Sequence, residues 1–257
     1  MSKAVILLTG ASRGLGAAAA REAAAQGCDL IINARNAERL ETVAEDCRAH
    51  GVAVNTVLGD IGEAKVAQAA VEAAHTRFGR LDALVHNAGV LPPIAPLAAA
   101  DLSAWEANWR VNFFAAVALL NEAIPLLRAT HGRAVLVSSG AATHPYPTWG
   151  AYCTSKAALN HLAAVLAAEE PQITTLAFRP GIVDTAMQAQ IREQGAGIMP
   201  PPLHAKFIAY QREARLQPPE VVARVLIAAA LRAPHEWSGR FVAYDDEEVQ
   251  ALLKGNT

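Results

Sequence analysis

The stretch that most constrains the fold lies at the start of the chain, where an apolar run, a glycine-rich turn and an alanine-rich segment follow one another. Residues 4–8 are continuously apolar, as in a strand buried on both faces of a parallel sheet. The turn Thr9–Gly16 has the pattern G-x3-G-x-G, and the alanine-rich segment reaches about Gln26 before Gly27 ends it. This order predicts a phosphate site, because small residues admit a pyrophosphate and the helix N-terminus supplies N–H groups.

The rest of the chain alternates between strand-like and helix-like segments. We expect strands at 28–34, 52–58, 83–85, 134–139, 173–178 and 240–244, and helices at 37–50, 63–78, 101–130, 152–170 and 219–232. The alternation predicts an α/β fold with one Rossmann-type domain over residues 1–257, a doubly wound parallel sheet of about seven strands with helices on both faces. Ligands bind beyond the carboxyl ends of such strands, where the glycine turn, Asn87–Gly89, Ser139 and Pro180–Thr185 fall.

The end of the second expected strand bears on which dinucleotide fits. A carboxylate at this point would hold the ribose 2′-hydroxyl of NAD and repel a 2′-phosphate. Here Arg35 and Asn36 follow Ala34, and the first acid is Glu38. Arg35 can pair with a phosphate in a fork geometry, and Arg13 in the glycine turn can reach the same side. We therefore expect NADP(H) rather than NAD(H).

Composition excludes several other classes of function. The net charge is −2 with no basic block, which argues against a nucleic-acid partner. We find no signal peptide and no apolar stretch expected to span a bilayer. Cys28, Cys47 and Cys153 are odd in number and lack metal-ligand spacing, so we expect reduced thiols in a cytoplasmic protein without a metal site.

Tyr152 and Lys156 lie four residues apart, one turn apart on one helix face. A phenol titrates near pH 10, too high for efficient proton transfer at neutral pH. An ammonium at roughly 4 Å would favour the phenolate by about 4 kcal/mol at an effective dielectric of about 20, with desolvation working against it. We therefore expect Lys156 to lower the pKa of Tyr152. This spacing is common on surface helices, so it is weak evidence by itself. It indicates a catalytic pair only together with other motifs, above all Ser139, thirteen residues upstream.

The glycine turn, Asn87-Ala88-Gly89, Ser139 and the Tyr152–Lys156 pair together resemble the short-chain dehydrogenase/reductase family, from Val5 to about Tyr244. The resemblance implies that Tyr152 donates a proton to the nascent alkoxide, or accepts one in the oxidative direction. It implies that Ser139 polarises the substrate carbonyl and that Lys156 also holds the cofactor ribose.

By the same resemblance, Asn112, which follows Val111, holds a local helix distortion and a water that links the lysine to solvent. The family also places adenine near Asp60-Ile61, its ribose near Asn87–Gly89, and the nicotinamide carboxamide under the turn at Pro180–Thr185. The implied cofactor residues are Gly10, Ser12, Arg13, Gly14, Leu15, Gly16, Arg35, Asn36, Asp60, Ile61, Asn87, Ala88, Gly89, Tyr152, Lys156, Pro180, Gly181, Val183 and Thr185. His86 is expected to be packed rather than catalytic.

The segment 186–217 is long and irregular in its sequence pattern, and we expect it to be a substrate lid. Apolar and aromatic side chains in and near it are suited to flat rings: Tyr146, Trp149, Met187, Met199, Phe207 and Tyr210. Of these, Tyr146, Trp149 and Met187 are the predicted substrate residues. Each could instead only pack the lid.

The tracts 146–156, 180–188 and 242–246 look most like sepiapterin-reductase-like members, including benzil reductases. This resemblance implies an NADPH-dependent carbonyl reductase acting on one carbonyl of a vicinal diketone. A pterin would ask for a carboxylate, and the lid offers only Glu193 and Glu213, so we expect an aromatic diketone to be preferred.

Other readings stay open, namely a non-catalytic NADP-binding sensor and, less well matched in length and glycine spacing, an epimerase or dehydratase. The family also implies a homodimer or homotetramer built on the helices at 101–130 and 152–170.

Overall fold

The computed structural model describes residues 3–254, so the ends of the predicted domain, 1–2 and 255–257, lie outside the described residues. Within that range the chain forms a seven-stranded parallel sheet in the order β3-β2-β1-β4-β5-β6-β7. The strands are β1 (Val5–Thr9), β2 (Asp29–Ala34), β3 (Val54–Leu58), β4 (Ala83–His86), β5 (Arg133–Val137), β6 (Thr174–Arg179) and β7 (Phe241–Ala243). The order reverses between β1 and β4, which confirms the doubly wound sheet and places a crevice between those strands.

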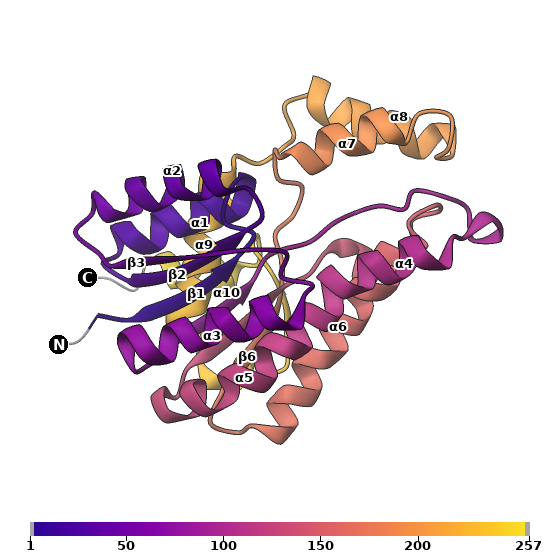
Figure 1. The fold of residues 1–257 in the computed structure, drawn as a ribbon. Helices are drawn as coiled ribbons and strands as arrows, with labels where there is room; N and C mark the ends of the chain where they lie inside the picture. The colour runs from indigo at the N-terminus through magenta and orange to yellow at the C-terminus, as the bar shows by residue number, and fades with distance from the viewer. Residues whose placement is uncertain (1–2, 255–257) are drawn as a thin grey trace.

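Helices cover both faces of the sheet (Figure 1). On one face lie α1 (Gly14–Ala25), α2 (Ala37–Arg48) and α9 (Pro219–Arg232), and on the other α3 (Ala64–Phe78), α5 (Ala115–Thr130) and α6 (Gly150–Glu169). Because side chains alternate along a strand, Ile6 and Leu8 join the first core, and Val5 and Leu7 join the second. Burial on both sides explains why the first strand is continuously apolar.

The long helix expected from residue 101 is interrupted. After α4 (Leu102–Trp109), residues Arg110–Phe114 form a π-helical turn before α5 begins. Asn112 lies in this turn with its side chain fully buried, and it bonds the backbone of Val90 with both ends of its carboxamide. The helix distortion implied for Asn112 is therefore present.

The segment 186–217 is not irregular, contrary to expectation. It forms α7 (Ala186–Gln194) and α8 (Pro201–Arg212), which lie apart from the two helical layers and away from both termini (Figure 1). The run Pro200–Pro202 misled the sequence reading, because Pro201 stands in the first turn of α8, where the missing N–H is not needed. A short helix, α10 (Glu247–Ala251), was also not anticipated.

The sequence analysis expected no apolar stretch able to span a bilayer, but one helix among the described residues is long and apolar enough to do so. The helical stretch Leu102–Thr130, with its π-helical turn included, is long and apolar enough, with a mean hydropathy of 1.4, to cross a bilayer by length and composition alone. One third of that window (33%) is buried within the chain. Phe114 and Val117 of this helix remain exposed, so its outer side presents an apolar surface.

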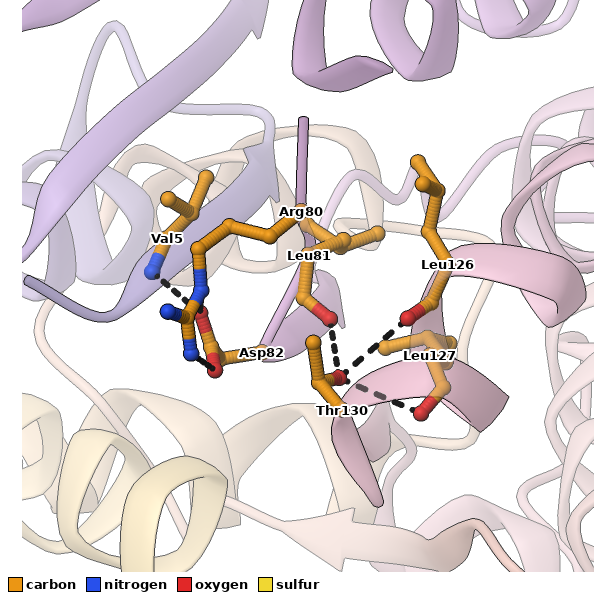
Figure 2. Close-up of polar contacts among 7 residues, drawn as sticks. All are labelled: Val5, Arg80, Leu81, Asp82, Leu126, Leu127 and Thr130. Atoms are coloured by element: carbon orange, nitrogen blue, oxygen red, sulfur yellow. Dashed lines mark hydrogen bonds and ion pairs between the residues drawn. The ribbon is translucent and has the colours of Figure 1, made fainter. Parts of the chain in front are cut away.

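The amino ends of β1 and β4 are tied together by paired polar groups (Figure 2). The Asp82 carboxylate accepts a hydrogen bond from the Val5 N–H at 2.8 Å, and two from the Arg80 guanidinium at 2.9 and 2.7 Å. The Thr130 hydroxyl, near the end of α5, lies 2.6 Å from the Leu81 carbonyl. These contacts fix strand and helix ends on the side of the sheet away from the crevice.

Candidate active site

A cleft with a volume of about 1350 Å³ runs along the carboxyl ends of the strands. Pockets for one small ligand typically have roughly 300–1,000 Å³, so this cleft has room for a dinucleotide and a substrate. All nineteen predicted cofactor residues line it, as do Tyr146, Trp149, Met187 and Ser139. Asn112 does not line the cleft and is fully buried.

The glycine turn forms a narrow cradle at the crevice between β1 and β4. A Cβ on Gly16 would lie 2.1 Å from the Gly10 carbonyl oxygen, so no larger residue fits there. Gly10 and Gly14 have φ of +70° and +54°, a conformation that side chains disfavour. The first N–H groups of α1 have no partner within the helix, so they can bind an anion. Cradle and helix end together fit the pyrophosphate of a dinucleotide.

Five arginines line the cleft, and four of them come from the glycine turn, α1 and the segment after β2, namely Arg13, Arg21, Arg35 and Arg39. Arg13 and Arg35 line the cleft as predicted, and Arg39 joins them. Arg35 also lies 3.6 Å from a carboxylate oxygen of Asp60, but at 61% exposure the pair is weak and can open. Asn36 caps α2 by accepting a hydrogen bond from the Arg39 N–H at 2.8 Å. Arg39 was not predicted, although its position three residues after the capping Asn36 places it in the first turn of α2, close to Arg35 in the sequence.

Tyr152 and Ser139 meet at one corner of the cleft. Tyr152 is 7% exposed, and burial raises its pKa to about 12, against a hydrogen bond with Ser139 that lowers it. The Lys156 ammonium lies 5.8 Å from the centre of the Tyr152 ring and donates to the Val137 carbonyl at 2.7 Å. Burial lowers the pKa of Lys156 to about 8. The expected lowering of the Tyr152 pKa by Lys156 is wrong, because burial raises this pKa and Lys156 is not among the groups that shift it.

The two serines at the end of β5 have different surroundings. The Ser138 hydroxyl bonds the side chain of Asn160 on α6. The Ser139 hydroxyl accepts from the Ala141 N–H at 3.1 Å and bonds Tyr152. Ser139 is therefore the serine that contacts Tyr152.

A buried amide network lies behind the lysine. The Asn112 carboxamide contacts the Asn108 oxygen at 2.9 Å and the Ser155 hydroxyl at 3.1 Å. A Cβ on Gly89 would lie 3.3 Å from the Asn112 carboxamide oxygen and 3.5 Å from the Lys156 ammonium. The absence of a side chain at Gly89 therefore leaves room for both groups to lie close to its backbone. Asn108 and Ser155 were missed, although one stands four residues before Asn112 and the other directly before Lys156.

His86 has a fixed proton position. The Thr9 hydroxyl accepts from the N–H groups of Asn87 and Ala88 at 3.1 and 3.0 Å, so its single hydrogen is left for His86 Nδ1 at 3.2 Å. Nδ1 is then an acceptor, and the ring proton sits on Nε2. Burial, and secondarily the charge of Lys156, lower the pKa of His86 to about 3. His86 is a neutral packed residue, as expected.

Aromatic rings form the wall next to Tyr152. Trp149 stacks on Tyr146 at 4.8 Å between ring centres and meets the Tyr152 ring edge-on at 6.0 Å. Phe207 and Tyr210 of α8 also line the cleft. Met199 instead lines a groove on the outer side of the lid. Cleft residues that the sequence analysis missed include Gln188, His144, Lys206 and Glu220.

The cysteines are free, and Cys153 packs against the aromatic cluster. Within residues 3–254, no group of three or more His, Cys, Asp or Glu side chains could hold a metal ion.

Comparison with known proteins identifies the family. Residues 4–196 match the family model described as short chain dehydrogenase. The chain belongs to the short-chain dehydrogenase family. It is 40% identical over 244 residues to an uncharacterized oxidoreductase of Schizosaccharomyces pombe, covering 93% of this chain and 96% of that protein. It is 35% identical over 257 residues to a benzil reductase, (S)-benzoin forming, of Saccharomyces cerevisiae, covering 95% and 97%.

A solved short-chain dehydrogenase/reductase from Saccharomyces cerevisiae superposes with a TM-score of 0.92 at 37% identity, over 97% of this chain and 99% of that one. The protein is thus an oxidoreductase of a family that uses nicotinamide cofactors, and it resembles the benzil-reductase-like members.

Proposed function

We propose that the protein is an NADPH-dependent carbonyl reductase that reduces one carbonyl of an aromatic vicinal diketone. The observation that carries this proposal is the contact between Ser139 and the buried Tyr152, which face the same cleft as the glycine cradle and stand beside a wall of aromatic rings. The benzil reductase among the relatives supports the substrate class.

Each residue of the corner has a definite task. Ser139 donates a hydrogen bond to the substrate carbonyl oxygen and polarises it. Tyr152, whose pKa is about 12, is protonated at neutral pH and can transfer its proton to the developing alkoxide. Lys156 holds the cofactor ribose, and Asn112, bonded to the Val90 backbone directly after Gly89, supports the site behind the lysine. Bound NADPH would supply the hydride.

The preference for NADPH rests on Arg13, Arg35 and Arg39. A 2′-phosphate carries negative charge that guanidinium groups bind in a fork geometry. Comparing kcat/KM for NADPH and NADH tests this, and we expect NADPH to be favoured at least tenfold. Arg35→Ala should reduce the preference, whereas Arg77→Ala, on the distant helix α3, should leave it unchanged. Equal values for the two cofactors in the wild-type protein would contradict the assignment.

Sepiapterin-type reduction is the second candidate. A pterin needs a carboxylate, and although neither Glu193 nor Glu213 lines the cleft, Glu220 does. Steady-state NADPH oxidation with benzil and with sepiapterin separates the candidates. We expect the higher kcat/KM with benzil, and a clear preference for sepiapterin that is lost in Glu220→Gln would favour the pterin instead.

We also propose that the protein forms homo-oligomers through α5 and α6. Phe114 in the π-helical turn directly before α5, Val117 of α5 and Val165 of α6 are 55%, 39% and 39% exposed, which is apolar surface that a second copy would cover. Light scattering after size-exclusion chromatography should give a dimer or tetramer. A monomer at micromolar concentration would contradict this.

A further inference from the structure

Two polar side chains in the substrate half of the cleft have an atom without a hydrogen-bond partner in the described part of the chain. They are the indole Nε1 of Trp149 and the carboxamide Oε1 of Gln188. Both residues are deeply buried, at 4% and 9% exposure, and both line the cleft. Leaving such a group unpaired costs about 1–3 kcal/mol, so a donor and an acceptor at one site point to a ligand that completes them.

Both residues are held beside the reacting corner. Trp149 stands directly before α6, with its ring fixed between Tyr146 and the edge of Tyr152. Gln188 lies in the first turn of α7, where its N–H bonds the Thr185 carbonyl at 2.9 Å. Trp149 packs in one apolar cluster with Ile191 and Phe207, and its N–H and the Gln188 oxygen are the buried polar atoms of the cleft lining here that lack a partner.

We propose that Trp149 and Gln188 form a subsite for an oxygen on the carbon next to the reacting carbonyl. This inference rests on the proposed carbonyl reduction, in which the first oxygen is held by Ser139 and Tyr152. The indole N–H is only a donor, so it selects an oxygen that accepts. The unpaired carboxamide atom is the oxygen, which as placed would accept from a hydroxyl, and after a turn of the amide the NH₂ group would instead donate to a second carbonyl.

The subsite therefore assigns a substrate class, ketones that bear an adjacent carbonyl or hydroxyl oxygen. A site built to hydrogen-bond an oxygen discriminates strongly against an analogue that lacks it, because its own polar groups are then left unpaired. A purely aromatic wall would not make this distinction, since it would bind two ketones with the same rings about equally.

The test compares benzil with deoxybenzoin, which has the same two rings but lacks the second oxygen. We expect the ratio of their kcat/KM values to fall about tenfold or more in Trp149→Phe, which keeps an aromatic ring and removes the N–H, and also to fall in Gln188→Leu. Trp105→Phe and Gln190→Leu are matched controls, because neither residue lines the cleft. Both should keep the wild-type ratio.

The outcomes separate this proposal from the proposed function. If wild-type protein reduces both ketones and the ratio is unchanged in Trp149→Phe and Gln188→Leu, the subsite is overturned while carbonyl reduction stands. If both variants lose activity equally on the two ketones, the residues only pack the wall, and the subsite is again overturned. Melting curves identify a variant that does not fold, in which case the other variant decides. If wild-type protein reduces neither ketone, both proposals fail.

Discussion

The two ends of the same sheet differ in how their polar groups are used. At the amino ends, Asp82 accepts from Val5 and Arg80, and Thr130 bonds the Leu81 carbonyl, so these groups satisfy one another (Figure 2). At the carboxyl ends, glycines open a cradle, and polar atoms on Trp149 and Gln188 have no partner in the described residues.

This difference indicates that the polar groups at the amino ends stabilise the fold, whereas those at the carboxyl ends are placed for binding a ligand. Paired polar groups stabilise the fold and present nothing new to a ligand, whereas unpaired ones carry a cost that only a ligand can offset. Substitutions at the two ends should therefore have opposite signatures. Substitutions at the amino ends should lower the free energy of unfolding and leave the catalytic rate unchanged. Substitutions at the carboxyl ends should lower the catalytic rate and leave the free energy of unfolding nearly unchanged.

The largest expected effect is at the carboxyl end. Tyr152→Phe removes the proton donor but keeps the buried ring, so kcat for NADPH-dependent ketone reduction should fall roughly 10²–10⁴-fold. The free energy of unfolding should change by less than about 1 kcal/mol, since one partly compensated hydrogen bond is lost. Steady-state kinetics and urea denaturation measure the two quantities. A near-wild-type kcat in Tyr152→Phe would show that Tyr152 is not the proton donor.

The amino end should show the opposite signature at smaller size. Asp82→Ala leaves the Val5 N–H without its acceptor and breaks the fork with Arg80, so the free energy of unfolding should fall by about 1–3 kcal/mol. Activity at 25 °C should stay within about twofold of wild type, because the site is at the other end of the strands. Glu72→Ala, on the exposed side of α3, is the control. A loss of activity without a loss of stability in Asp82→Ala would contradict the comparison.

The smallest effect concerns the pH dependence of stability at the carboxyl end. The pKa of Lys156 is about 8 in the fold against 10.5 as its ordinary value, so between these values the unfolded state binds more protons. The free energy of unfolding should then rise with pH, and this lysine should contribute about 1 kcal/mol between pH 8 and 9.

Lys156→Met lacks this titration, so the difference in unfolding free energy between the two proteins isolates it. The comparison cancels the buried cysteines, whose raised pKa values act in the opposite direction above pH 9. Parallel pH profiles for the two proteins would show that the lysine is not titrating near pH 8.

Local signals explain what the sequence could predict. The glycine turn, the apolar runs and the spacing of Ser139, Tyr152 and Lys156 each lie within a short stretch, and they were enough for the sheet and for the residues along the cleft. The helices α7 and α8 were missed because a proline run both ends one segment and begins another.

What depends on the packed fold could not be read from the sequence. The pKa of Tyr152 is raised chiefly by burial of the ring, which the spacing of Tyr152 and Lys156 does not indicate. The unpaired atoms of Trp149 and Gln188 are defined only by their surroundings, so no local pattern marks them. Arg39 lay within reach of a local rule, since it follows the capping Asn36 by three residues.

The most direct test of the central claim follows NADPH with wild-type protein and a panel of ketones that includes benzil, deoxybenzoin and sepiapterin. NADPH binding is measured in parallel by its fluorescence. We predict saturable binding, NADPH oxidation with benzil, and one α-hydroxy ketone formed per NADPH consumed. Saturable NADPH binding with no oxidation by any ketone of the panel would contradict the account, and would indicate a protein that binds the cofactor as a sensor rather than an enzyme.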